Sequence, residues 1–581
     1  MEVKEGLSAF ISSVRNGEEG PESSALFDSL DDVLEVMAAL GEELPNIEDP
    51  TSFHAAMNTE YREQWKDACE SELKGIADME VYKLVLRLEI PEGCKILKGK
   101  WVLTVKRDKL GKPTRFKARY VLCGYEQIVG RDYNRTTSPT ARMESFRLLL
   151  HIAVSLDWDM QQFDVKQAFL HGVLEPDEVQ FMSQPEGFEV EGKEDWVWHV
   201  EKGLYGMHQA GRIWNKTMHD RMISWGFRRL DCEYCVYARD DDSGSVLTAV
   251  HVDDFVLIAS SKAANDVFKQ QMKSEWTIAE GDADFCLGIE IKRDRPNKFV
   301  YVSQKAMIDR IINTFGQNDT YPATTPMVDN ANSFLKRSHP DECLSEEEKK
   351  DLTKLPYCSL IGQLLYPSLG SRPDIAYAVR KLSEFLDCFR CSHWEAAIRV
   401  VHYLKGTRDL RLRLGGGGMT LKGFTDSSWG DCQDGWRSSM GYCYTMGSGI
   451  ILWSARKQKV VATSSTEAEY IAASESCKEA IWLCTMLSLM PSPISQPSAA
   501  SPVNATPLYC DNNRAVCLSL DPQFHSRTKH FDIRYHYIRQ CIENGEISIQ
   551  RVCTNDNIAD IFTKPLAITP FTHFRRLLGL C

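Results

Sequence analysis

The spacing of apolar residues along the chain predicts alternating helices and strands. Residues 58–80 repeat apolar side chains with a helical period that includes Trp65. Two strand-like runs follow, at 101–105 and 116–122, and the Gly-Lys-Pro turn between them predicts a hairpin. The first half should also contain a helix at 146–156, a strand near residue 164 and strands from 235 to 260.

The second half of the chain has a different order of elements. Residues 331–355 are polar and charged, which indicates a linker, and residues 357–406 have helical periodicity. After the glycines at 415–418 the pattern becomes strand, strand, strand, helix, strand, helix, helix, strand, helix, an order typical of an α/β domain. A stretch rich in Pro, Ser and Ala at 491–506 predicts a mobile surface loop inside this domain.

Composition indicates the class of protein. With 581 residues, 43% of them hydrophobic and 26% charged, the chain should form several globular domains. No apolar run approaches the roughly 18 residues needed to span a membrane, and the first residues lack a secretion signal, so we expect no membrane association. Nineteen irregularly spaced cysteines are typical of reduced, intracellular thiols rather than of a disulfide framework.

The net charge of −13 would disfavour nucleic acid as a partner if it were spread evenly. It is concentrated in residues 1–50, which contain thirteen acidic and only two basic side chains. We expect this acidic segment to be mostly disordered. The remaining 531 residues carry a net charge of only −2, so basic clusters can dominate locally and nucleic-acid binding stays open.

Two adjacent aspartates, Asp253 and Asp254, interrupt an apolar run at 249–258. Burying one unpaired charge costs several kcal/mol, so such a pair indicates a strongly positive neighbour, and a divalent metal is the obvious candidate. Upstream, Asp164 follows another short apolar run. Three carboxylates on neighbouring strand ends can hold two metals for phosphoryl transfer, which is the chemistry of a nucleotide polymerase.

A second set of acids lies in the C-terminal α/β region. Asp426 and Asp511 each end a predicted strand, Glu467 opens a helix after a hydroxyl N-cap, and Asp560 begins the last helix. Any one of them alone is more readily explained as a cap or a surface charge. Their placement on four separate elements favours convergence at one end of a sheet, which would form a second two-metal site suited to hydrolysis.

The chain resembles the reverse transcriptase and ribonuclease H part of a copia-type retrotransposon Pol polyprotein. The resemblance covers roughly residues 50–568. Its motifs, in family order, are Phe116–Arg119, Asp164–Leu170, Leu204–Ala210, Val252–Asp254, Phe285–Glu290, Arg372–Val379, Ser464–Tyr470, His525–His530, Asp532–His536 and Ala559–Leu566.

This resemblance implies a fold of mixed class, α+β and α/β, with several domains. A right-hand polymerase with fingers, palm and a short thumb near 262–330 would precede a helical connection and a ribonuclease H-like domain. The expected boundaries are 1–50 for the acidic segment, 51–330 for the reverse transcriptase, 331–418 for linker and connection, 419–568 for the ribonuclease H-like domain and 569–581 for a C-terminal tail.

The resemblance also implies residue roles. Each active site would hold two Mg²⁺ ions, with Mn²⁺ as an alternative. The polymerase ligands would be Asp164, Asp253 and Asp254 with the carbonyl of Val165, and the nuclease ligands Asp426, Glu467, Asp511 and Asp560. For the nucleotide, Arg119 would contact the triphosphate, Phe169 would be the steric gate against a ribose 2′-hydroxyl, and Gln209 would line the pocket.

A basic helix is predicted at about 527–539, with Arg527, His530 and Arg534 on one face. That face could bind an RNA–DNA hybrid or could be a solvated charged surface. The implied partners are an RNA template, a DNA primer, deoxynucleoside triphosphates (dNTPs), the hybrid, and other Pol and Gag products of the element. The family assembles particles in the cytoplasm, with the nucleus as an alternative location.

Some features depart from the family pattern. His251 stands where a tyrosine is usual, and no protease or integrase domain is recognised, so we expect one section of a larger polyprotein or a truncated copy. Asp242-Ser243-Gly244 matches the aspartic protease signature, but its place between two predicted strands favours a turn. Two alternatives therefore stay open: an inactive or domesticated copy that binds nucleic acid, and a remnant with nuclease activity alone.

Overall fold

The computed structural model describes residues 48–107, 113–337, 352–431, 435–494, 505–520 and 536–581, together with residue 350. The acidic segment, apart from residues 48–50, lies outside these ranges, as does most of the predicted 491–506 loop. The same holds for Arg527, His530 and Arg534, so their predicted face is not described.

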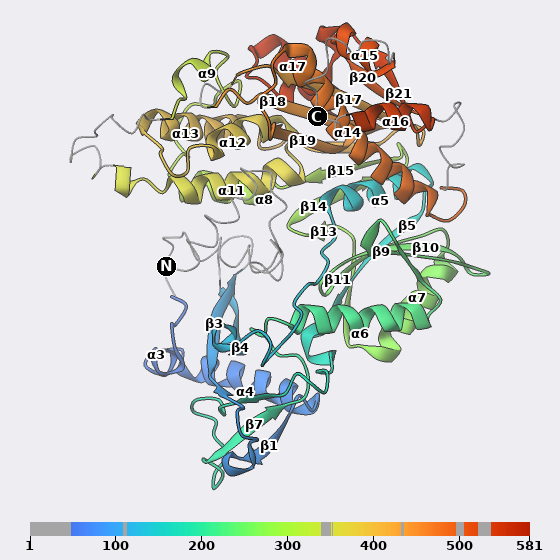
Figure 1. Ribbon diagram of the computed structural model, residues 1–581. Helices are drawn as coiled ribbons and strands as arrows, with labels where there is room; N and C mark the ends of the chain where they lie inside the picture. The colour runs from blue at the N-terminus through green and yellow to red at the C-terminus, as the bar shows by residue number, and fades with distance from the viewer. Residues whose placement is uncertain are drawn as a thin grey trace.

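The N-terminal part of the described chain is built around a hairpin and one helix. Strands β3 (Gly99–Arg107) and β4 (Pro113–Leu122) pair antiparallel, and helix α4 (Arg62–Asp78) packs against β4. The hairpin and the helix agree with the sequence-based prediction. Trp65 of α4 is fully buried and meets Phe116 edge to face. A small sheet with the order β1-β7-β6-β2 lies beside this unit, at the bottom of Figure 1 (Tyr82–Leu86, Trp196–Val200, Gln180–Met182 and Ile96–Leu97).

The central part is a six-stranded sheet with the order β12-β5-β11-β10-β9-β8. Helices α6 (Ala210–Ser224) and α7 (Lys262–Glu275) share a core with one set of strand residues, including Phe255 and Leu257. Helix α5 (Met143–Ser155) packs with the alternate set, including Val256 and Ile258. The strands are β5 (Asp159–Val165), β8 (Arg228–Leu230), β9 (Glu233–Asp241), β10 (Gly244–His251), β11 (Asp254–Ala259) and β12 (Ile278–Asp282).

This sheet bears on two sequence-based expectations. The Asp242-Ser243-Gly244 segment joins β9 to β10, so the predicted turn is confirmed. Helix α7 packs on the central sheet and β12 pairs with β5, so the first part of the segment predicted as the thumb, 262–330, belongs to the central sheet unit. The next sheet consists of β13 (Phe285–Cys286), β14 (Ile289–Asp294), β15 (Phe299–Ser303) and, from beyond the helical connection, β16 (Leu412–Gly415).

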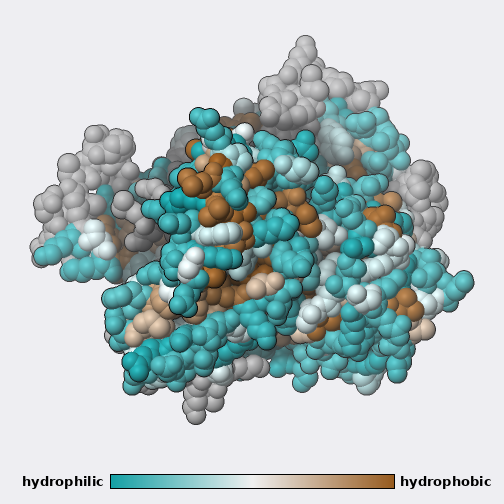
Figure 2. All heavy atoms as spheres, turned by 90° about the horizontal axis from the view of Figure 1, so that it is seen from below, coloured by the Kyte–Doolittle hydropathy of each residue, from teal (hydrophilic) through white to brown (hydrophobic). Residues whose placement is uncertain are grey.

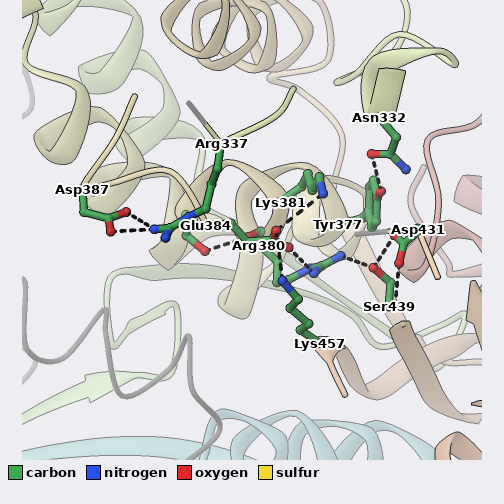
Figure 3. Close-up of polar contacts among 11 residues, drawn as sticks. Asn332, Arg337, Tyr377, Arg380, Lys381, Glu384, Asp387, Asp431, Ser439 and Lys457 are labelled. Carbon is green, nitrogen blue, oxygen red and sulfur yellow. Dashed lines mark hydrogen bonds and ion pairs between the residues drawn. The ribbon is translucent and has the colours of Figure 1, made fainter. Parts of the chain in front are cut away.

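The helical connection contains α11 (Tyr357–Gly370), α12 (Ala376–Ser383) and α13 (Cys391–Gly406), as the periodicity predicted. A polar network fixes α12 to the C-terminal sheet (Figure 3). The guanidinium of Arg380 donates to Glu384 at 2.6 Å and to Ser439 Oγ at 2.5 Å, and Lys457 lies 3.8 Å from Glu384. The connection is therefore held to the last domain by buried charges as well as by apolar packing.

The C-terminal sheet has the order β19-β18-β17-β20-β21, antiparallel from β19 to β17 and parallel from β17 to β21. Helix α14 (Ser465–Ser488) packs on β17 and β18. The predicted order of strands and helices is confirmed. Its members are β17 (Leu421–Ser428), β18 (Ser439–Met446), β19 (Gly449–Lys457), α14, β20 (Thr506–Cys510), α15 (Asn513–Leu520), α16 (Tyr537–Glu543), β21 (Ile547–Arg551) and α17 (Ile568–Leu577).

The expected C-terminal tail at 569–581 is instead part of the packed structure. Phe571 and Phe574 of α17 are buried, because their spacing places both on one side of the helix. The last residue, Cys581, exchanges two backbone hydrogen bonds with Arg411, at 2.8 and 3.0 Å. The prediction of a tail was wrong.

The central sheet, the connection and the C-terminal sheet share one apolar core. Figure 1 shows the connection and the C-terminal sheet at the top of the molecule and the central sheet below them, on the right. Arg147 of α5 lies at their junction, fully buried. It donates to the carbonyls of Ile451 and Leu369 at 2.6 and 2.7 Å and stacks over the Trp453 ring at 3.9 Å.

The surface seen from below is mostly hydrophilic, with hydrophobic residues gathered near its centre (Figure 2). Among the described residues, no helix has the length and apolar character needed to cross a membrane.

Candidate active sites

The aspartates predicted for polymerisation meet at one end of the central sheet. Strands β5 and β11 are antiparallel neighbours, and Asp164 lies directly opposite Asp254. Asp253 occupies the turn between β10 and β11, and its carbonyl accepts a hydrogen bond from the Val165 amide at 2.9 Å. The structure therefore brings all three carboxylate residues and Val165 together, although they come from separate parts of the chain.

The turn that carries Asp253 and Asp254 is strained. Val252 has a φ of +55°, a left-handed conformation that is rare for a β-branched residue and costs on the order of 1–3 kcal/mol. Two contacts hold it: the Val165–Asp253 backbone bond, and a hydrogen bond of 2.6 Å from Trp214 Nε1 to the Val252 carbonyl. Strain of this kind, stabilised by its surroundings, is typical of functional turns.

Neighbouring polar groups already contact two of these acids. The ammonium of Lys166 pairs with Asp164, and the Gln162 side-chain amide donates to Asp254 at 3.0 Å. The Asp164 side chain is 38% exposed, so it stays accessible to a ligand from solvent. The arrangement offers partly exposed carboxylate oxygens, the ligands that hard cations such as Mg²⁺ prefer.

The residues predicted to meet a nucleotide lie in two places. Arg119 on β4 has its guanidinium 4.9 Å from the centre of the Tyr205 ring, and Phe169 in a 3₁₀ helix (Ala168–His171) meets the same ring at 5.5 Å. Gln209, in contrast, is fully buried. It accepts from Gln127 at 3.1 Å and donates to the Asp132 carbonyl at 3.3 Å. Gln209 therefore lies inside the protein, hydrogen-bonded to the segment 127–132, and does not line an open pocket.

Three of the C-terminal acids converge. Asp426 lies on β17 and Asp511 directly follows β20, and these parallel neighbours pair Thr425 with Cys510. Asp560 comes from a 3₁₀ helix (Ile558–Phe562) that packs on β17 and β18. One carboxylate oxygen from each acid lies within 4.8 Å of the other two.

Burial and mutual repulsion control the charge of this cluster. Burial, and then the nearby Asp426, raise the pKa of Asp560 to about 8, and the same two causes raise the pKa of Asp511. Lys564 pairs with one oxygen of Asp560 at 2.9 Å. The other carboxylate oxygen of Asp560, Oδ1, is buried without a hydrogen-bond partner, and the Asp560 side chain is only 6% exposed. A cation beside Asp426 and Asp511 would satisfy that oxygen.

Glu469, and not the predicted Glu467, lies beside the three converging acids. Glu467 turns back to accept hydrogen bonds from the amide and hydroxyl of Thr463, at 2.6 and 2.7 Å, as part of the helix cap. Burial, then Asp426 and Asp511, raise the pKa of Glu469 well above its usual value, so Glu469 faces the cluster. Its oxygen also lies within 4.8 Å of ligand atoms of Cys510 and Asp511.

The sequence did contain a signal for Glu469. Counting along α14, the small residues Ala473, Ser476 and Ala480 lie four, seven and eleven positions after it, and all are buried. That spacing marks the side of the helix that packs on the sheet. Glu467 lies off this line, in the first turn, where a carboxylate commonly serves as a cap.

Known proteins resemble this chain over most of its length. Residues 79–329 match the family model for reverse transcriptase (RNA-dependent DNA polymerase). The Pol polyprotein from transposon TNT 1-94 of Nicotiana tabacum is 36% identical over 534 residues, 92% of this chain and 39% of that protein. A putative transposon Ty5-1 protein of Saccharomyces cerevisiae is 34% identical over 323 residues, 54% of this chain and 99% of that protein. The chain belongs to the copia-type retrotransposon Pol polyprotein family.

This copia-type chain carries a reverse transcriptase domain, and it spans only part of its plant relatives. The Pol polyprotein from transposon RE2 of Arabidopsis thaliana is 32% identical over 89% of this chain but 34% of its own length. A solved foamy viral protease-reverse transcriptase in complex with double-stranded DNA aligns over 95% of this chain at 12% identity, with a TM-score of 0.44, and this similarity is too weak to support an argument.

Proposed function

We propose that this chain is an RNA-directed DNA polymerase that also cleaves the RNA of RNA–DNA hybrids, with a separate metal-dependent site for each reaction. The observation that carries the polymerase assignment is the register of β5 against β11. It sets Asp164 opposite Asp254, beside the strained turn of Asp253, inside a reverse transcriptase domain.

In the polymerase site, Asp164, Asp253 and Asp254 would hold two Mg²⁺ ions, with the carbonyl of Val165 as a further oxygen ligand. Bound there, the ions would lower the pKa of the primer 3′-hydroxyl and neutralise charge on the leaving pyrophosphate. Arg119 would contact the triphosphate, because a guanidinium fork matches phosphate oxygens. Phe169 would exclude the ribose 2′-hydroxyl by its ring.

In the C-terminal site, Asp426, Glu469, Asp511 and Asp560 would hold two Mg²⁺ ions. The fit is supported by the buried oxygen of Asp560 that lacks a partner and by carboxylates whose pKa values rise because they repel one another. A divalent cation offsets that repulsion and supplies an activated water for hydrolysis of a phosphodiester. Mn²⁺ is an alternative at both sites, since it accepts the same oxygen ligands.

The substrates would be an RNA template, a DNA primer, dNTPs and the hybrid that synthesis produces. Other Pol and Gag products of the element would assemble with this chain in cytoplasmic particles. These partners follow from the family and from the two sites, which act on successive forms of the same nucleic acid.

The test is extension of a DNA primer on poly-rA with dTTP and Mg²⁺, together with cleavage of an RNA–DNA hybrid. Replacing both Asp253 and Asp254 by Asn should abolish extension and spare cleavage, whereas Asp426→Asn should do the reverse. Asp282→Asn, an exposed acid on the same sheet, is the matched control and should leave both reactions unchanged. Absence of extension by folded wild-type protein would leave a nuclease or a binding protein.

A further inference from the structure

Tyr205 connects the two side chains that would recognise a nucleotide. Its ring meets Phe169 edge to face, with centroids 5.5 Å apart and planes at 76°. The guanidinium of Arg119 lies over the same ring, 4.9 Å from its centroid. Phe169 follows β5 of the central sheet and Arg119 belongs to the hairpin of β3 and β4, so one aromatic ring touches both of these elements.

The backbone around Tyr205 is fixed on the Arg119 side. The Leu122 amide, three residues after Arg119 on β4, donates to the Tyr205 carbonyl at 2.8 Å. The next residue, Gly206, has a φ of +86°, and a side chain there would put its Cβ 2.1 Å from the Leu122 carbonyl oxygen. Only glycine permits this approach, which holds Tyr205 beside the strand of Arg119.

The same segment is fixed on the Phe169 side. Gly203 donates to the Gly172 carbonyl at 2.7 Å, just after the 3₁₀ helix that carries Phe169. A Cβ at Gly203 would lie 2.7 Å from the Phe169 carbonyl oxygen, so the two backbones touch directly. Residues 203–206 therefore bridge both elements through backbone contacts, and the Tyr205 ring fills the space between the two side chains.

A second bridge supports Arg119 from helix α4. Glu72 lies near enough to Arg119 and Lys117 for both to lower its pKa, although burial is the larger effect and raises it overall. The Glu72 side chain also forms a hydrogen bond with Gln167, which directly precedes the 3₁₀ helix. The Gln167 amide packs on Gly75 of α4, and a Cβ added at Gly75 would lie only 2.5 Å from its nitrogen. Arg119 therefore has the Glu72 carboxylate and the Tyr205 ring as neighbours, and each of them also contacts the 3₁₀ helix of Phe169 or the residue just before it.

The same ring lies near the proposed metal site. Burial, opposed by Arg119 and reinforced by Glu72, Asp253 and Asp164, raises the pKa of Tyr205. Tyr205 is therefore a neutral phenol within electrostatic reach of both strand-end carboxylates. The ring that contacts Arg119 and Phe169 therefore also lies near the acids proposed to bind metal.

We infer that Tyr205 is a specificity-determining residue, which sets the preference for deoxyribonucleoside over ribonucleoside triphosphates by holding Phe169 and Arg119 in one arrangement. The inference rests on the proposed polymerase function. A steric gate rejects a 2′-hydroxyl only if its ring cannot tilt away, and the edge contact from Tyr205 blocks that motion. Since Arg119 touches the same ring, the triphosphate and the sugar are positioned together.

The test compares kcat/KM for dTTP and UTP on poly-rA in wild type, Tyr205→Phe and Tyr205→Leu. The ring makes both contacts, so Tyr205→Phe should keep the dTTP/UTP ratio within about twofold, whereas Tyr205→Leu should lower it by about tenfold or more, mainly through faster use of UTP. KM for dTTP should rise more than kcat falls, because Arg119 loses its support. Tyr82→Leu, which removes a stacked ring in the small sheet, is the matched control and should keep the ratio.

Equal losses for dTTP and UTP in Tyr205→Leu, at an unchanged ratio, would overturn the inference and leave Tyr205 a structural residue. If that variant does not fold, Tyr205→Met keeps most of the volume and is judged by the same ratio. A wild type that extends no primer would defeat the proposed function instead. The inference then stands or falls on competition of dTTP and UTP for the enzyme–primer–template complex with Ca²⁺, where Tyr205→Leu must reduce the preference for dTTP.

Discussion

Trp214 Nε1 donates a hydrogen bond of 2.6 Å to the carbonyl of Val252. Trp214 belongs to α6 and is 1% exposed, and Val252 is the left-handed residue of the turn that carries Asp253 and Asp254. A single buried indole therefore joins a helix on one face of the sheet to the strained turn at its end. Because metal ligands must be placed accurately, this bond should matter for chemistry as well as for stability.

Trp214→Phe should destabilise the protein and slow polymerisation. Leaving the partly buried Val252 carbonyl without its donor costs about 1–3 kcal/mol, and a shift of the turn would lower primer extension by about 10- to 100-fold. Thermal unfolding and single-nucleotide extension measure the two effects. Trp65→Phe is the matched control, since Trp65 is equally buried but its Nε1 has no hydrogen-bond partner. Equal effects of both changes would show that lost volume, not the bond, is responsible.

Glu469→Gln and Glu467→Gln should separate the two candidates for the fourth C-terminal acid. Glu469→Gln should reduce hybrid cleavage by about 100-fold or more, because it removes a charged metal ligand. Glu467→Gln should retain cleavage and cost about 1 kcal/mol of stability or less, since it weakens a helix cap. Primer extension by both variants should match wild type. Loss of cleavage in Glu467→Gln alone would restore the assignment made from sequence.

The polymerase acids could be located from sequence because the signal is local. Asp253 and Asp254 interrupt an apolar run, and strand periodicity places them at a strand end with no knowledge of the fold. The register that sets Asp254 opposite Asp164 is a tertiary fact, yet it agrees with that local pattern. Their role as metal ligands stays a prediction.

The missed features depend on contacts between distant segments. Which glutamate of α14 faces the acids is decided by the side of the helix that packs on β17, and Gln209 is buried by partners more than seventy residues away, Gln127 and Asp132. The β12 strand, within the segment predicted as the thumb, pairs with β5 of the central sheet, and no local pattern reveals that pairing. The helix at the C-terminus, in contrast, could have been predicted from local sequence, because Phe571 and Phe574 have helical spacing.

His151 should make the stability of the protein depend on pH. It is fully buried under the C-terminal domain, where its Nδ1 accepts from the Gly415 amide at 3.2 Å, and burial lowers its pKa to about 4. Above pH 6.5 both folded and unfolded chains hold neutral imidazole. Between pH 6.5 and about 4 only the unfolded chain gains a proton, so stability falls as pH falls, by about 3 kcal/mol in total.

His151→Gln should remove that share of the pH dependence, because its amide oxygen can still accept from Gly415 but does not titrate. The measurement is urea unfolding at pH 7 and pH 4.5 for both proteins. Burial also lowers the pKa of His393 to about 4. His393 is present in wild type and in the variant, so its contribution to the pH dependence cancels when the two proteins are compared. An identical loss of stability in the variant would show that His151 does not titrate as described.

Arg147→Met should destabilise the central sheet and the C-terminal domain together. The change leaves the carbonyls of Ile451 and Leu369 without their Arg147 donor, and removing a buried, bonded charge costs about 3–5 kcal/mol. Arg142→Met is the matched control at the same junction, because Arg142 is 52% exposed and its pair with Glu479 at 3.5 Å is worth about 1 kcal/mol or less.

Calorimetry shows whether the two domains unfold as one unit. Since α5, the connection and the C-terminal sheet share one apolar core, Arg147→Met should shift the main unfolding transition as a whole, and hybrid cleavage should be lost at the same temperature as primer extension. Two separate transitions, with only one moved by the substitution, would mean that the domains unfold independently. In that case Arg147 would act as a tether between them and not as part of a common core.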